Sequence, residues 1–120
     1  MKKWLTALAL CTTATMGFAQ TATELIGKWQ LVDYKDPKGK TMNIERELGT
    51  TQVFQVFSAP NVFQSILGKD GTRGTWSMSP DNKVLTVKAG MKMNFEIKTF
   101  TPTMRVIVTE DKETLTYEKR

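Results

Sequence analysis

The sequence predicts an all-β domain, folded as a single antiparallel up-and-down barrel of about eight strands. From Leu25 onward, apolar runs of roughly five to eight residues recur at the spacing of about 8 to 12 residues that is typical of sandwiches and barrels. Turn segments rich in Gly, Pro, Asn, Asp or Ser separate these runs. Because no helical stripe is long enough to cover an apolar sheet face, closure of the sheet on itself is favoured.

The strands are placed by the turns between them, such as Asp36-Pro37-Lys38-Gly39, Ser58-Ala59-Pro60-Asn61 and Ser79-Pro80-Asp81-Asn82. In chain order, the expected strands are Gly27 to Lys35, Thr51 to Phe57, Val62 to Leu67, Arg73 to Met78, Val84 to Lys88, Met93 to Phe100, Thr103 to Thr109 and Thr114 to Lys119. An eight-stranded barrel is just wide enough to be filled by side chains or to hold one small ligand.

The registers of three hairpins follow from setting apolar residues opposite one another. A turn at Pro80-Asp81 sets Met78 opposite Leu85 and Trp76 opposite Val87. A loop at Thr101-Pro102 sets Ile97 opposite Val106 and Phe95 opposite Val108, and the next turn sets Val108 opposite Leu115 and Val106 opposite Tyr117. The polar residues then share the outer face: Asn94, Glu96, Lys98, Arg105 and Thr109.

The hairpin of residues 51–57 and 62–67 has two apolar faces. With the loop at Ser58 to Asn61, one face carries Val53, Phe57, Val62 and Ile66, and the other carries Phe54, Val56, Phe63 and Leu67. Only one face can enter the barrel, so the other needs a cover, which the Lys40 to Thr50 segment, a second copy of the protein or another partner could supply. Phe54, Phe57 and Phe63 are therefore candidates for an association surface, used for homodimerisation or for another protein partner.

The longest connection, Lys40 to Thr50, contains a predicted helical turn. Asn43 is a candidate N-cap, Ile44 and Leu48 share one face, and Gly49 stands where the helix would end. The segment is interpreted either as a lid over the barrel mouth or as a solvated loop.

Residues 1–19 are predicted to be an export signal, leaving a barrel domain at residues 20–120. Lys2 and Lys3 precede an apolar stretch, and Gly17-Phe18-Ala19 is a small-x-small cleavage pattern. The stretch is shorter than the ~20 residues of a spanning helix. A periplasmic or secreted protein without a membrane span is expected.

Composition excludes most enzyme mechanisms. The chain has no His, and its single Cys, Cys11, lies in the predicted signal. The predicted mature domain therefore has no thiol or imidazole nucleophile and no zinc site of the usual ligand types, and no catalytic residue, metal or cofactor is predicted. Removing Lys2 and Lys3 leaves 15 basic and 12 acidic residues, a net charge of +3, which is too small to imply a nucleic-acid partner.

Two tryptophan segments carry a family resemblance. Gly27-Lys28-Trp29 resembles the Gly-x-Trp opening of lipocalins, and Gly74-Thr75-Trp76-Ser77 is similar to the middle of short secreted bacterial lipocalin-like domains. The likeness spans most of residues 24 to 119. It implies a small-ligand barrel in which Gly27 and Trp29 are structural and Arg120 stands for the basic residue that covers the tryptophan.

The first functional hypothesis is non-catalytic binding of a small apolar or amphipathic molecule inside the barrel. The alternative is a protein-binding module, such as an exported inhibitor or a dimerising domain, acting through the hairpin of residues 51–67. A packed core without a cavity is the structural alternative to a ligand site. The candidate ligand-binding residues are Trp76, Met78, Met93, Phe95, Met104, Val106 and Tyr117.

Overall fold

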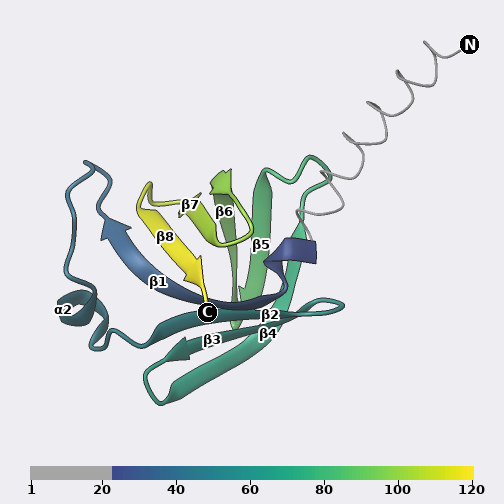
Figure 1. The fold of residues 1–120 in the computed structure, drawn as a ribbon, viewed down its shortest axis with the longest axis horizontal. Coiled ribbons are helices and arrows are strands. Elements are labelled where there is room, and N and C mark those ends of the chain that lie inside the picture. The colour runs from purple at the N-terminus through teal and green to yellow at the C-terminus, as the bar shows by residue number, and fades with distance from the viewer. Residues whose placement is uncertain (1–22) are drawn as a thin grey trace, which may run out of the picture.

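The computed structural model describes residues 23–120, so the predicted export signal and Cys11 lie outside the described residues. All eight strands form one closed antiparallel barrel, in which each strand pairs with its neighbours in sequence and β8 returns to pair with β1 (Figure 1). This confirms the predicted fold class. The elements are β1 (Gly27–Lys35), α2 (Ile44–Leu48), β2 (Val53–Ser58), β3 (Val62–Leu67), β4 (Asp70–Met78), β5 (Val84–Ala89), β6 (Met91–Phe100), β7 (Met104–Val108) and β8 (Thr114–Lys119).

The turns alternate between the two ends of the barrel because each strand reverses the direction of the last. One end, here called the mouth, is formed by the connections at 36–52, 68–69, 90 and 109–113. The other, the closed end, is formed by the connections at 59–61, 79–83 and 101–103 and by the residues before β1.

Trp29 and Leu25 fill the closed end. Both are fully buried, and the Trp29 indole Nε1 donates a hydrogen bond of 2.9 Å to the Leu25 carbonyl oxygen. Phe100 meets the indole edge-on, with ring centroids 6.1 Å apart. The placement agrees with the structural role that the lipocalin resemblance implies for Trp29.

The β4–β5 register is confirmed: Trp76 lies opposite Val87 and Met78 lies opposite Leu85. The two strands approach closely beside this pair. A Cβ atom on Gly74 would lie 1.8 Å from the carbonyl oxygen of Lys88, so glycine is required there for a steric reason.

The predicted β6–β7 register is wrong by one residue at Ile97 and by two at Phe100, and the predicted β7–β8 register is wrong by one. Ile97 lies opposite Ile107 and Phe100 opposite Arg105, with a bulge between Ile97 and Thr99. An extra residue in one strand reverses which face the following residues occupy. Arg105 and Ile107 therefore point inward and are fully buried, while Val106 points outward.

The predicted β2–β3 register is also wrong by one residue. A three-residue turn, 59–61, sets Phe57 opposite Phe63, so both rings face the interior at a centroid distance of 5.2 Å. Phe54 lies on the outer wall, half-buried, with the Lys28 ammonium 4.3 Å from its ring centre. Of the three predicted surface residues, only Phe54 is placed where a partner can reach it.

The helical turn in the longest connection is confirmed. The Asn43 side chain accepts a hydrogen bond from the Arg46 amide, and Gly49 ends α2 in the left-handed conformation. Ile44 and Leu48 pack against the edge of the core. This packing argues against a fully solvated loop.

Candidate functional site

A cleft of about 440 Å³ opens at the mouth, between the start of β6 and the β7–β8 turn. Its apolar lining comes from one strand: Met91, Met93 and Phe95 of β6. Its polar lining comes from both sides: Lys92 and Asn94 of β6, and Thr109, Glu110, Asp111 and Glu113 of the turn. The cleft is therefore amphipathic.

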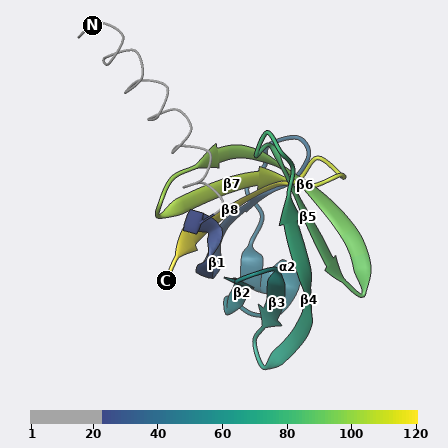
Figure 2. The same cartoon turned by 90° about the vertical axis from the view of Figure 1, so that its right-hand side faces the viewer.

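The cleft exists because the β5–β6 hairpin extends farther toward the mouth than β7 does. β6 pairs with β5 as far as Met91, whereas its pairing with β7 starts only at Glu96. Residues 91–95 therefore extend beyond the end of β7, and Figure 2 shows the β5–β6 hairpin standing apart from β7 and β8. The separation exposes side chains of the inward face, and Met91 is 69% exposed.

Two hydrogen bonds fix the turn that forms the far wall of the cleft. The backbone N–H of Asn94 donates to the Glu110 carboxylate at 3.1 Å, and the Tyr34 hydroxyl donates to the Glu113 carboxylate at 2.5 Å. The bond to Glu113 and partial burial raise the pKa of Tyr34 to about 12. The phenol therefore stays protonated at neutral pH, and two of the three carboxylates at the cleft already have partners.

The structure brings only some of the predicted ligand-binding residues to this cleft. Met93 and Phe95 line it. Trp76 does not line the cleft: it shares a row with Met93 through Val87, but its ring meets Phe57 edge-on at 5.8 Å and its Nε1 donates to the Ser58 carbonyl oxygen, both toward the closed end.

The other predicted residues lie elsewhere. Met78 does not line the cleft, although it shares a row of the interior with Phe95 through Leu85. Tyr117 is buried deeper, opposite Arg105. Met104 and Val106 are wrongly placed by the predicted register: Met104 is 38% exposed on the outer wall, and Val106 lies on that wall as well.

Sequence reasoning missed the most polar group of the interior. Arg105 is fully buried, and its Nη2 donates a hydrogen bond of 2.7 Å to Oε1 of Gln55, which is also buried. Its guanidinium carbon lies 4.5 Å from the ring centre of Tyr117 and 5.1 Å from those of Trp29 and Phe57. The sequence offered one signal, the single charged residue within the apolar run from Met104 to Val108. The bulge in β6 decides whether that residue faces the interior or the outer wall.

Burial acts on the charge states of this cluster. It lowers the pKa of Arg105 to about 10, and the nearby Tyr117 opposes that shift. Arg105 is therefore still protonated at neutral pH. Burial also raises the pKa of Tyr117 to about 12, so that its phenol is neutral.

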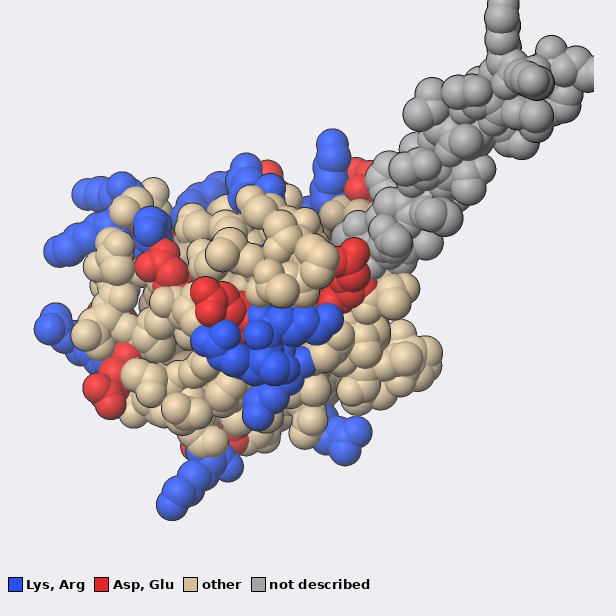
Figure 3. All heavy atoms as spheres, viewed as in Figure 1, with Lys and Arg blue, Asp and Glu red and all other residues tan. Residues whose placement is uncertain are grey.

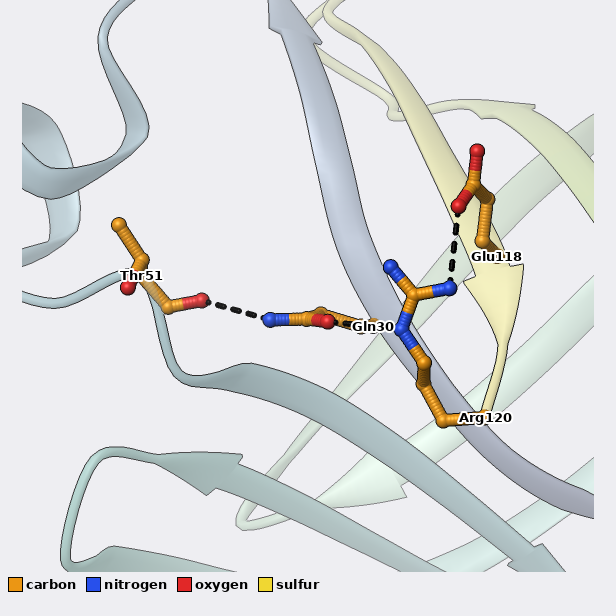
Figure 4. A network of polar contacts seen from close by, with 4 residues as sticks. All are labelled: Gln30, Thr51, Glu118 and Arg120. Carbon is orange, nitrogen blue, oxygen red and sulfur yellow. Dashed lines mark hydrogen bonds and ion pairs between the residues drawn. The ribbon is translucent and has the colours of Figure 1, made fainter.

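Arg120 does not cover Trp29, which corrects the role implied by the resemblance. Its Nε donates to Gln30 at 2.9 Å and its Nη1 donates to Glu118 at 3.0 Å, on the outer wall (Figure 4). Gln30 in turn donates to the Thr51 carbonyl oxygen, which ties β1 to the chain just before β2. The cations near Trp29 are Arg105 and Lys119, whose ammonium lies 5.4 Å from its ring centre.

The face seen in Figure 3 carries basic and acidic side chains side by side, with one basic cluster near its centre bordered by acidic groups. Within residues 23–120, no group of three or more acidic, Cys or His side chains is arranged to hold a metal ion. No helix in that same range is long and apolar enough to cross a membrane.

Comparisons with known proteins identify the fold. No family model matches the chain, and no curated protein matches it. Among solved structures, it is similar to a lipocalin-like protein from Bacteroides uniformis, with a TM-score of 0.65 and 17% identity over 81% of this chain and 99% of that one.

Two further solved structures give the same picture. An uncharacterized protein from Bacteroides eggerthii has a TM-score of 0.65 and 15% identity over 80% of this chain and 99% of that one. A DUF4847 family protein from Bacteroides vulgatus has a TM-score of 0.57 and 12% identity over 78% and 92%. At these identities the likeness defines the architecture alone: the chain has a lipocalin-like fold.

Proposed function

We propose that the protein is an exported, non-catalytic binding protein that takes up a small amphipathic molecule through the mouth of its barrel. The observation that carries this proposal is the cleft lined by Met91, Met93 and Phe95. Concave sites with an apolar lining and a few polar groups are the usual form of small-molecule sites. Thioether side chains adapt to ligands of different shape.

Packing favours the mouth over the closed end as the place of binding. Trp29, Phe57 and Phe63 are buried at the closed end and shut it off from solvent. At the mouth, by contrast, Met91 is largely exposed and Met93 is half-buried. A ligand that covers these side chains removes apolar surface from water, at about 25 cal/mol per Å².

A catalytic role is disfavoured by the chemistry of the lining. The chain has no His, and Cys11 lies in residues 1–19. At the cleft, Glu110 and Glu113 accept the hydrogen bonds from Asn94 and Tyr34. General acid–base catalysis needs a titratable group placed to exchange a proton with a substrate, whereas these two carboxylates hold the turn in place.

The first test is a titration of the protein with decanol, followed by tryptophan emission. Trp76 shares a row of the barrel with Met93, so a ligand at the cleft is expected to change its emission. Trp76→Phe should remove most of that change, and Trp29→Phe should keep it. Decanol that leaves the emission of the wild-type protein unchanged, and shows no heat of binding by calorimetry, would refute the proposed function.

A pair of methionine variants locates the site. Met93→Trp fills part of the cleft and is expected to weaken decanol binding at least about tenfold, the loss that corresponds to about 1.4 kcal/mol. Met104→Trp makes the same substitution on the outer wall and should leave binding unchanged. Equal effects of the two substitutions would place the ligand elsewhere.

Export is tested separately from binding. The mature protein is expected in the periplasmic or extracellular fraction with Gln20 as its N-terminal residue. N-terminal sequencing of the protein from its native host would show this cleavage. An intact Met1 in the cytoplasmic fraction would contradict it.

A further inference from the structure

The guanidinium of Arg105 lacks a counterion in the interior of the barrel. Nε and Nη1 are buried and have no hydrogen-bond partner within residues 23–120, while Nη2 donates to Gln55. Among the ion pairs of the described residues, none involves Arg105. A buried charge with unpartnered donors is costly, and native interiors rarely retain such groups without a reason.

The geometry of the group shows what kind of acceptor fits. A guanidinium has two edges that present paired N–H donors, Nε with Nη2 and Nη1 with Nη2. Gln55 accepts from Nη2, which has a second hydrogen, and both other nitrogens are unpartnered. Whichever hydrogen Gln55 takes, one two-donor edge is left for an acceptor with two coplanar oxygens.

The aromatic neighbours do not fill this role. Trp29, Phe57 and Tyr117 lie 4.5 to 5.1 Å from the guanidinium carbon and interact through their ring faces. Such contacts stabilise the positive charge but accept no hydrogen bond of ordinary strength from its edges. The site thus combines a fixed cation with an unused pair of donors.

We propose that Arg105 binds the carboxylate of an amphipathic acid whose apolar part lies toward the mouth. This inference rests on the proposed function, because the ligand enters through the same cleft. Thr109, which lines the cleft, is four residues from Arg105 along the strand direction, a distance of about 13 Å. An extended alkyl chain spans that distance, and to bring its head group to Arg105 with its tail at Met93 it must displace Ile107, which is fully buried between Arg105 and Thr109.

A carboxylate fits better than a phosphate. It brings one negative charge to one guanidinium, so the buried pair is neutral, and its two oxygens match one edge in a bidentate pair. A dianionic phosphate would leave a net charge in the interior, which is costly to desolvate.

The test compares head groups on one alkyl chain, using the wild-type protein with decanoate, decanol, decyl phosphate and decyltrimethylammonium in calorimetry at low salt. Decanoate is expected to bind at least about tenfold more tightly than each of the others. Equal affinities for decanoate and decanol would overturn the assignment of Arg105 while leaving the proposed function standing. Tighter binding of decyl phosphate would reassign the site to phosphates and overturn the carboxylate proposal.

Variants show whether Arg105 itself carries the preference. Arg105→Met is expected to abolish the preference of decanoate over decanol, whereas Arg73→Met, on the exposed outer wall, should keep it. Arg105→Lys retains a charge without the paired donors and should keep only part of the preference. A full preference retained by Arg105→Met, or by Arg105→Lys if the former does not fold, would overturn the proposal.

Stability of the ligand-free protein gives a second readout. If Arg105 is a carboxylate-binding residue, Arg105→Met removes an uncompensated buried charge from the ligand-free protein. The melting temperature of the ligand-free variant should then equal or exceed that of the wild type. Decanoate should then raise the melting temperature of the wild type but not that of the variant. A large loss of stability in Arg105→Met, with equal decanoate and decanol affinities in the wild type, would show that Arg105 only supports Trp29.

Discussion

The close approach of β4 and β5 makes Gly74 a sensitive position for barrel closure. A Cβ atom placed there would lie 1.8 Å from the carbonyl oxygen of Lys88 and 2.9 Å from the Cα of Ala89. Both obstacles are backbone atoms, so no side-chain rotation relieves them. Gly74→Ala must therefore move one strand relative to the other.

The size of that movement sets the expected cost. Bringing the Cβ–oxygen distance from 1.8 Å to 3.0 Å requires a shift of about 1.2 Å, which stretches an ordinary hydrogen bond past its useful range. Each backbone hydrogen bond lost in this way costs about 0.5 to 1.5 kcal/mol. With the pairing of Thr75 and Lys88 disturbed, Gly74→Ala should lower the free energy of unfolding by about 1 to 3 kcal/mol.

Gly71→Ala is the matched control because Gly71 lies in the same strand. Its Cβ would meet only the Ser65 carbonyl oxygen, at an ordinary contact distance of 3.6 Å. This control should leave stability unchanged or raise it by up to about 1 kcal/mol. Urea unfolding followed by circular dichroism compares the two variants. If both unfold at the same urea concentration, the steric argument for β4 and β5 is refuted.

Three further predictions concern stability. Trp29→Ala should cost about 3 to 5 kcal/mol, because it empties the closed end and removes the bond to Leu25; a wild-type melting temperature would contradict this. Asn43→Ala should cost about 1 kcal/mol through the lost cap of α2, measured by urea unfolding; no change would argue against the cap. Burial raises the pKa of Tyr117 to about 12 from 10.0, so its stabilisation is complete below pH 10 and is lost as pH rises through 12. Between pH 10 and 12, the free energy of unfolding of Tyr117→Phe relative to the wild type should therefore rise by up to about 1.4 kcal/mol per pH unit. Unfolding at several alkaline pH values measures this difference, and a difference that does not change with pH would refute the assigned pKa.

The strands were predictable because turn residues mark them. Gly27 to Lys35, Val62 to Leu67 and Thr114 to Lys119 agree at both ends with the structure. The helical turn after Asn43 was predictable for the same reason, since its cap and its terminating Gly49 are local signals. Closure into a barrel followed from the lack of any helix able to cover the sheet.

Strand registers were not predictable where a single residue decides them. The bulge between Ile97 and Thr99 carries no distinct sequence signal, yet it turns Arg105 inward. In an apolar stretch such as Val106 to Val108, the residue types are compatible with either face of the sheet, so they do not fix the register. The sequence-based register therefore placed Arg105 on the outer face because it is charged, whereas the fold buries it.

The candidate site was only half predictable for a related reason. Met93 and Phe95 were expected on the inward face, and they line the cleft. The cleft itself arises from the extra length of the β5–β6 hairpin relative to β7, a relation between distant segments. Local patterns do not encode such a difference, so the lining from Glu110 and Glu113 was missed.

Methionine methyl NMR tests most directly the claim that a ligand binds at the mouth. Protein labelled with carbon-13 in its methionine methyl groups is titrated with decanoate. We expect the methyl signals of Met91 and Met93, at the cleft, to shift and saturate, while that of Met104, on the outer wall, stays in place. Unchanged signals from Met91 and Met93 at saturating decanoate, or shifts confined to Met104, would contradict it.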